Sequence, residues 1–288
     1  MRQSESQFVE IRGLRYHVRR WPRAGAPKVF LFHGWMDVSA SFQFLVDALR
    51  GDWDVYAPDW RGYGLTEWGK SDCYWFPDYI ADLDFLLREI QPAKPANLVG
   101  HSLGGNVVAL YAGIRPGRVG KLINLEGFGL PPTRPEQAPR RYEAWLDELD
   151  ERPQLRPYAN FAELAERLRK NNPRLPAERA QFLAQHWGRE EGGGVVLRSD
   201  PAHKVINPLL YRYEEVRACW QQVSAPVLWV EASESDTLKR MKMDPAQQAE
   251  RRAAFPNLRH EIVKEAGHML HHDQPEAVAR LIEDFLLR

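Results

Sequence analysis

Short apolar segments that are typical of buried strands alternate with helical segments along most of this sequence. Residues 28–32 (KVFLF) form a continuous apolar run, as expected for a strand that is buried on both faces. Further strand candidates lie at residues 53–57, 96–99, 119–125, 226–230 and 258–263. Helical periodicity occurs between or after them at residues 42–49, 79–90, 103–114 and 277–287. This alternation indicates parallel βαβ units, and it predicts an α/β fold with a mostly parallel, twisted sheet and helices on both faces.

Two regions depart from the alternation. Residues 8–21 alternate apolar and polar side chains around Gly13, which predicts a β-hairpin. Residues 130–222 are helical in pattern, rich in proline and charge, and contain no convincing strand. Because a helical block that interrupts a parallel sheet reads as an insertion, we expect a core of residues 1–129 and 223–288 and a helical cap of residues 130–222.

Composition excludes several classes of partner. The 288-residue chain has 39 Lys plus Arg and 39 Asp plus Glu, so no global field attracts nucleic acid or an anionic membrane. No apolar run approaches the roughly 18 residues of a membrane span, and residues 1–10 lack the apolar stretch of a secretory signal. Cys73 and Cys219 are expected to be buried thiols. We expect a cytoplasmic protein that binds a small molecule, and a homodimer is compatible with this picture.

A candidate nucleophile follows the strand at residues 96–99. Gly100-His101-Ser102-Leu103-Gly104 matches the G-x-S-x-G pattern and lies between this apolar strand and a helical segment. So tight a strand-to-helix turn strains the serine backbone, and the glycines remove side chains that would clash there. The turn places a hydroxyl at a helix N-terminus, where negative charge is favoured. The structural alternative is a serine that merely caps the helix.

His268 is the best base among the nine histidines. It follows the strand candidate at residues 258–263 and precedes the last helix, and ligands meet an open α/β sheet at such strand ends. His33 is better interpreted as part of a His33-Gly34-Trp35 turn, and His101 should point away from Ser102. A metal cluster is an alternative for His268, His271, His272 and Asp273. No second ligand set matches that cluster, so we predict no metal.

Acyl transfer also needs two backbone N–H groups aimed at the developing oxyanion. One should come from Leu103, directly after the nucleophile. The other should come from Trp35, in the turn after His33-Gly34.

Taken in order, these motifs resemble the α/β-hydrolase superfamily, in its capped, single-domain branch. The matching stretches are His33-Gly34-Trp35, residues 59–64 (DWRGYG), residues 100–105 (GHSLGG) and residues 267–276 (GHMLHHDQPE). The resemblance implies that Asp59 and Arg61 are structural. Haloalkane dehalogenases and epoxide hydrolases of this fold carry an aspartate at the elbow, whereas Ser102 indicates acyl-type chemistry.

The third triad member, the acid that orients the histidine, is ambiguous in the sequence. In most of the family it is an aspartate shortly after the strand that corresponds to residues 226–230. Asp236 is our first choice, although it lies about one residue late and Ala232 replaces the usual glycine. Glu126, after the strand at residues 119–125, is the first alternative, and Glu234 is the second. A purely structural role for Glu126 would be to anchor the start of the cap.

These residues predict a carboxylesterase-like serine hydrolase that cleaves an ester or related acyl bond through an acyl-enzyme, with no cofactor. C–C bond hydrolysis or perhydrolysis would use the same triad, and a non-catalytic binding or sensor protein could keep the same fold. The cap aromatics suggest an apolar pocket, or else they only pack the cap: Tyr142, Trp145, Tyr158, Phe161, Phe182, Trp187, Tyr211 and Tyr213.

Overall fold

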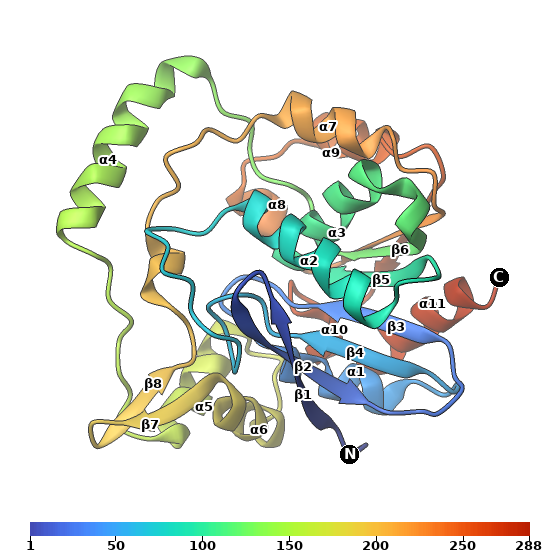
Figure 1. The fold of residues 1–288 in the computed structure, drawn as a ribbon, viewed down its shortest axis with the longest axis horizontal. Helices are drawn as coiled ribbons and strands as arrows, with labels where there is room; N and C mark the ends of the chain where they lie inside the picture. Colours follow the sequence, from blue (N-terminus) through green and yellow to red (C-terminus); the bar gives the residue numbers. More distant parts are fainter.

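The computed structural model describes residues 1–288 and is built around one eight-stranded sheet with strand order β1-β2-β4-β3-β5-β6-β9-β10 (Figure 1). The strands are β1 (Glu5–Ile11), β2 (Leu14–Trp21), β3 (Lys28–Phe32), β4 (Asp54–Pro58), β5 (Ala96–His101), β6 (Val119–Leu125), β9 (Val227–Ala232) and β10 (Leu258–Val263). β2 pairs antiparallel with both β1 and β4, and all other pairs are parallel. The predicted α/β class is confirmed.

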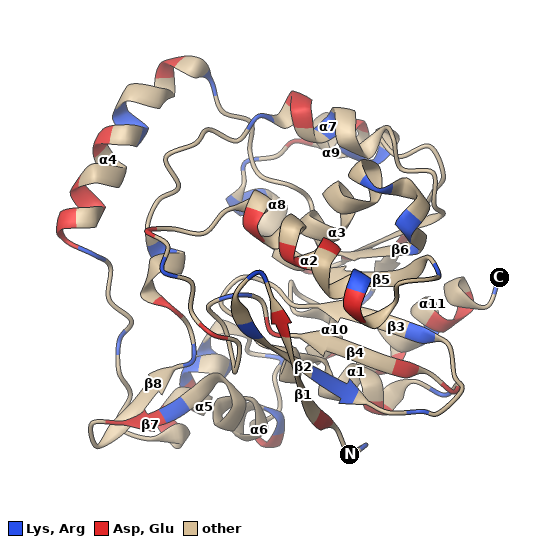
Figure 2. Cartoon of the chain, viewed as in Figure 1, with Lys and Arg blue, Asp and Glu red and all other residues tan.

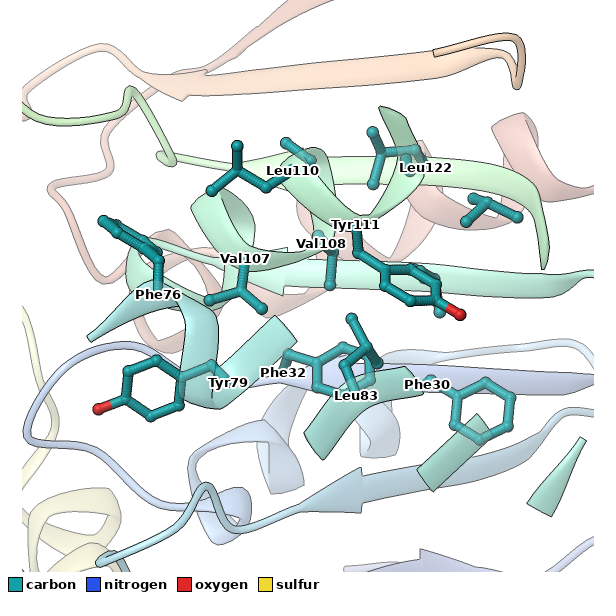
Figure 3. Close-up of a cluster of buried hydrophobic side chains, with 14 of the residues drawn as sticks. Phe30, Phe32, Phe76, Tyr79, Leu83, Val107, Val108, Leu110, Tyr111 and Leu122 are labelled. Atoms are coloured by element: carbon teal, nitrogen blue, oxygen red, sulfur yellow. The ribbon is translucent and has the colours of Figure 1, made fainter. Parts of the chain in front are cut away.

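Helices cover both faces of this sheet. On one face lie α2 (Phe76–Ile90), α3 (Leu103–Ile114) and α7 (Tyr213–Trp220), and on the other lie α1 (Gln43–Ala48) and α11 (Pro275–Leu286). Phe30 and Phe32 of β3 enter the first core, whereas Val29 and Leu31 enter the second, as the two-residue period of a strand requires. Figure 3 shows the first core, where side chains of α2 and α3 meet those of β3 and β6.

Three short helices lie between β9 and α11 in the chain: α8 (Thr237–Arg240), α9 (Pro245–Ala253) and α10 (Leu270–Asp273). Acidic and basic side chains are interspersed over the helices, as the equal numbers of each lead one to expect (Figure 2). None of the helices combines the length and the apolar character that crossing a membrane requires.

The segment that we expect to be a cap contains one feature that the sequence interpretation missed. Besides α4 (Ala138–Asp150), α5 (Phe161–Asn171) and α6 (Ala177–Trp187), it holds a hairpin of β7 (Gly188–Glu191) and β8 (Gly194–Leu197). The expectation of no strand in this segment is therefore wrong. Gly192 and Gly193 have φ of 60° and 82°, which is the backbone that a two-residue hairpin turn needs.

The rest of this segment divides into two parts. α5, α6 and the β7–β8 hairpin share a small apolar core, which Phe44 of α1 joins. α4 buries no residue and lies apart from the sheet in Figure 1. α7 packs against α3 of the sheet layer. The division of the chain into core and cap at residues 129 and 223 stays a prediction.

Candidate active site

The turn from β5 into α3 has the strained geometry that the sequence predicts. Ser102 has φ of 52° and ψ of −113°, a conformation that is unfavourable for a residue with a side chain. A Cβ on Gly100 would lie 2.4 Å from the carbonyl carbon of Gly104, and a Cβ on Gly104 would lie 2.1 Å from the carbonyl oxygen of Phe32. Only glycine fits at either position, so the packing around the turn holds the serine in place.

The predicted base meets the predicted nucleophile. His268 lies in the loop between β10 and α10, and its Nε2 is 3.0 Å from Ser102 Oγ. The other ring nitrogen, Nδ1, is 3.1 Å from Glu126 Oε2. The three side chains therefore form a continuous hydrogen-bonded chain from hydroxyl to imidazole to carboxylate.

Glu126 directly follows β6 and is held from several sides. Its side chain is fully buried, and its backbone has φ of 57°. Oε1 accepts a hydrogen bond from the backbone N–H of Ala232 (2.8 Å), and Oε2 accepts one from Ser235 Oγ (2.5 Å). Three donors around one buried carboxylate satisfy it and fix its direction toward His268.

Neither of the other two candidate acids reaches His268. Asp236, our first choice, is 65% exposed at its side chain and forms an ion pair with Arg240. Glu234 is also exposed and pairs with Arg174. The structure therefore corrects the choice of Asp236 and places Glu126, the alternative, beside the histidine. β6 and β9 are neighbours in the sheet, so their ends share one edge and either strand can present an acid there.

The two predicted oxyanion donors lie next to the nucleophile. Leu103 is the first residue of α3, so its N–H has no partner within the helix. Trp35 follows Gly34, and a Cβ on Gly34 would be only 3.2 Å from Ser102 Cβ. Trp35, Leu103 and Ser102 line the same cavity. The use of their N–H groups as an oxyanion hole stays a prediction.

His101, His272 and Asp273 have other partners. His101 points away from Ser102, and its Nε2 hydrogen-bonds the backbone carbonyl of His268 (2.8 Å), which ties the base loop to the elbow. His272 Nε2 lies 3.1 Å from Ser41 Oγ, and Asp273 accepts hydrogen bonds from Gly267 and Asn172. These residues do not converge with His268 on a metal site.

A different group of possible metal ligands lies nearby. Asp37, His101 and His271 are buried, and their ligand atoms lie within 4.8 Å of one another. Neither Asp37 nor His271 contacts Ser102, and the sequence interpretation did not consider this grouping.

Two cavities meet at the triad, and Trp35 lines both. The smaller, about 300 Å³, contains Ser102 and Leu103 and is walled by aromatic side chains of residues 74–79. The larger, about 720 Å³, contains His268 and is lined partly by α5 and α6. Of the eight aromatic residues considered for a cap pocket, only Trp187 lines either cavity. The apolar wall comes instead from Tyr74, Trp75, Phe76 and Tyr79, in a segment that the sequence did not single out.

The DWRGYG segment is an internal brace. Asp59 accepts hydrogen bonds from His17 Nδ1 (2.7 Å) and from the backbone N–H groups of Ser39 and Leu65. Burial opposes ionisation of Asp59, but these partners hold its pKa well below its usual range. Arg61 forms a two-pronged ion pair with the buried Asp82. Both residues act on the scaffold, as the family resemblance implies.

Buried neutral histidines make stability depend on pH. Burial lowers the pKa of His33 to about 4 and that of His203 to about 3. Below the unfolded pKa of about 6.5, the unfolded chain binds protons that the folded chain does not, so the free energy of unfolding falls as pH falls. We expect a loss on the order of 2 kcal/mol per histidine by pH 5. Urea unfolding at pH 7.5, 6 and 5 measures it.

His203→Phe provides the internal comparison for this prediction. Phenylalanine can keep the stacking of His203 against Tyr63 and Tyr74 but cannot be protonated. The free energy of unfolding should depend less steeply on pH in His203→Phe than in the wild type. The difference in slope corresponds to about one proton, or about 1.4 kcal/mol per pH unit. A slope that is the same in both proteins would contradict the assignment.

Residues 27–275 match the family described as the alpha/beta hydrolase fold. The chain belongs to the α/β-hydrolase fold family. A serine hydrolase-like protein of Danio rerio is 30% identical over 312 residues, covering 99% of this chain and 90% of that protein. Esterase YbfF of Escherichia coli is 23% identical, covering 90% of this α/β-hydrolase and 92% of the esterase.

Solved structures agree with this α/β-hydrolase assignment. The thioesterase domain from the curacin biosynthetic pathway superposes with a TM-score of 0.87 at 25% identity, covering 98% of this chain and 99% of that domain. E-2-(acetamidomethylene)succinate hydrolase superposes with a TM-score of 0.78 at 23% identity, covering 99% of this chain and all of the other, which is a likeness of fold. Relatives named as hydrolases and esterases support hydrolase activity for this chain.

Proposed function

We propose that this α/β-hydrolase cleaves an ester or a related acyl bond with a triad of Ser102, His268 and Glu126. The observation that carries the proposal is the hydrogen-bonded chain from Ser102 Oγ through His268 to the buried Glu126, with separations of 3.0 and 3.1 Å. A nucleophile within reach of a base, and a base oriented by a third group, is the recurring arrangement of acyl-transfer enzymes.

The first half of the reaction forms the acyl-enzyme. Ser102 Oγ attacks the carbonyl carbon of the ester, and His268 Nε2 takes the hydroxyl proton. The negative charge that develops on the carbonyl oxygen is stabilised by the N–H groups of Trp35 and Leu103. The bond to the leaving oxygen then breaks, and His268 gives its proton to that oxygen, releasing an alcohol.

The second half regenerates the enzyme. Water attacks the acyl carbon of the Ser102 ester and gives a proton to His268. The second tetrahedral intermediate collapses, the carboxylic acid leaves, and the proton returns from His268 to Ser102 Oγ. Glu126 stays ionised throughout and stabilises the imidazolium that forms in each half.

The two cavities suggest how a substrate lies across the triad. The leaving oxygen must face His268, which lines the larger cavity. The acyl group is bonded to Ser102 and must extend into the smaller, aromatic cavity that this serine lines. We therefore assign the acyl group to the 300 Å³ cavity and the alcohol to the 720 Å³ cavity.

A fluorophosphonate probe tests the proposed function, because it phosphonylates only an activated serine. The wild-type protein should be labelled at Ser102, as located by peptide mass spectrometry, and should hydrolyse 4-nitrophenyl esters. A folded protein that neither reacts with the probe nor turns over any ester of an acyl-length series would instead be a binding protein on this fold.

Esterase activity should survive exhaustive dialysis against EDTA, since the serine mechanism draws no step from a metal. The measurement is kcat/KM for a 4-nitrophenyl ester before and after chelation, with the metal content determined in parallel. Loss of activity that zinc or manganese restores would contradict the expectation and would direct attention to Asp37, His101 and His271.

A further inference from the structure

The cavity beside Ser102 contains one side chain that the proposed reaction does not use. Arg141, a half-buried residue of α4, lines this cavity together with Ser102. Its Nε donates a hydrogen bond to the backbone carbonyl of Asn207 (2.6 Å), and it forms no ion pair with a carboxylate. The guanidinium therefore keeps donors without a protein partner at the acyl cavity.

No other full charge lines this cavity. None of its residues is Asp or Glu, and five of them are the aromatic side chains Trp35, Tyr74, Trp75, Phe76 and Tyr79. His203 also lines it, but burial lowers the pKa of His203 to about 3, so this ring is neutral at physiological pH. A half-buried cation beside these aromatic walls is less well solvated than one in bulk water, so an anion that pairs with it gains more there than it would in bulk water.

The geometry and the single charge of the Arg141 guanidinium favour one class of anion. A guanidinium offers parallel N–H donors that match the two oxygens of a carboxylate, and one positive charge balances one carboxylate. A phosphate dianion would call for a second cation, which the residues around this cavity do not include. The cavity volume of about 300 Å³ is at the small end of ligand sites, so the acyl chain it takes is short.

We propose that Arg141 makes this enzyme selective for esters whose acyl group carries a carboxylate at the end far from the scissile bond. The substrate class is then the monoesters of short dicarboxylic acids. This inference rests on the proposed function, because it takes the cavity beside Ser102 as the acyl site.

Two substrates of equal length test the inference. Mono-4-nitrophenyl adipate carries the distal carboxylate, and the corresponding terminal amide carries a neutral group of the same size in the same place. We expect the wild-type protein to have a kcat/KM at least about tenfold higher for the charged substrate, as hydrogen bonds to charged groups provide. Arg141→Gln should lower that preference by about 10- to 100-fold, mainly through KM, and Arg141→Lys should retain part of it.

Arg140→Gln is the matched control. Arg140 is the preceding residue of α4, is exposed and lines neither cavity. It carries the same charge, so its removal tests whether the general field of α4 produces the preference. The ratio of kcat/KM between the two substrates should stay at the wild-type value in this variant.

Further outcomes separate the two proposals. If the wild-type protein hydrolyses neither substrate and fails to react with the fluorophosphonate probe, the proposed function is wrong. If it hydrolyses both with a ratio that Arg141→Gln does not change, the inference is overturned and Arg141 serves only to hold α4 to Asn207. If the Arg141 variants fail to fold, inhibition of the wild-type reaction on the neutral ester decides: free adipate should inhibit competitively and more strongly than hexanoate, and equal inhibition would overturn the inference.

Discussion

Replacing Ser102 by alanine should reduce ester hydrolysis by a factor on the order of 10⁴ or more. Without Oγ, no acyl-enzyme forms, and only the oxyanion donors and substrate binding remain to assist attack by water. The measurement is kcat/KM for a 4-nitrophenyl ester, with protein purified to exclude traces of wild type. Alanine at position 102 removes only the hydroxyl and must adopt the same backbone, with φ of 52°. The circular dichroism spectrum of the variant should therefore match that of the wild type.

Ser224→Ala is the comparison for this variant. Ser224 is exposed, lies just before β9, and its hydroxyl contacts none of the triad residues. Its activity should equal that of the wild type. If Ser102→Ala keeps wild-type turnover with an intact fold, then Ser102 is not the nucleophile and the elbow serves only to begin α3.

Glu126→Gln should be the second crippling change, with a fall in kcat on the order of 10⁴ by analogy with the triad acid of serine proteases. Glutamine keeps the shape of the side chain and can still accept the hydrogen bond from Ala232. It loses the negative charge that stabilises the imidazolium, and its amide no longer fixes the tautomer of His268. The melting temperature should be recorded beside kcat, since the change also alters the contact with Ser235.

Asp236→Asn is the matched comparison, because Asp236 and Glu126 are both candidates for the triad acid. Asp236 is exposed and pairs only with Arg240, and such surface pairs contribute at most about 1 kcal/mol to stability. Its kcat should change by less than about threefold, since Asp236 lines the larger cavity but forms no hydrogen bond or ion pair with His268. A severe loss in Asp236→Asn with a mild one in Glu126→Gln would reverse the assignment and imply that the loop after β9 rearranges when substrate binds.

The local part of the site could be predicted from the sequence. The elbow at Gly100–Gly104 depends on residues next to one another, because the strain on Ser102 and the room that glycine provides arise within one turn. His268 was identified for a similar reason, since it directly follows a strand whose end must lie at the ligand edge of the sheet. The alternation of strands and helices likewise gave the parallel sheet.

The triad acid could not be predicted from the sequence in the same way. β6 and β9 lie side by side, and their ends present Glu126 and the residues after Ala232 to the same point. Which carboxylate turns inward depends on tertiary contacts, here the bonds that Ala232 and Ser235 give to Glu126. Ser235 places a hydroxyl against the buried carboxylate while Asp236 turns to solvent, and spacing alone does not distinguish these directions.

Two features outside the proposed triad were not predicted from the sequence, each for a different reason. The hairpin of β7 and β8 had a usable signal, three glycines at 192–194 ahead of two valines, which the surrounding charge obscured. Arg141 had no signal, because it is one of several arginines in a charged helical stretch. Only the cavity that it shares with Ser102 distinguishes it.

The position of Glu126 has a consequence for how freely the chain can change in length. The backbone N–H of Ser102 bonds to the carbonyl of Leu125, and that of Glu126 bonds to the carbonyl of Val230. The proposed nucleophile and acid are thus spaced by the pairing of three adjacent strands rather than by a loop. The segment from Asp236 to Asp244, which follows the position where most of the family keeps its acid, is then free to gain or lose residues as long as Ser235 stays in place. Descendants of this sequence should accumulate insertions there before they do so at the end of β6.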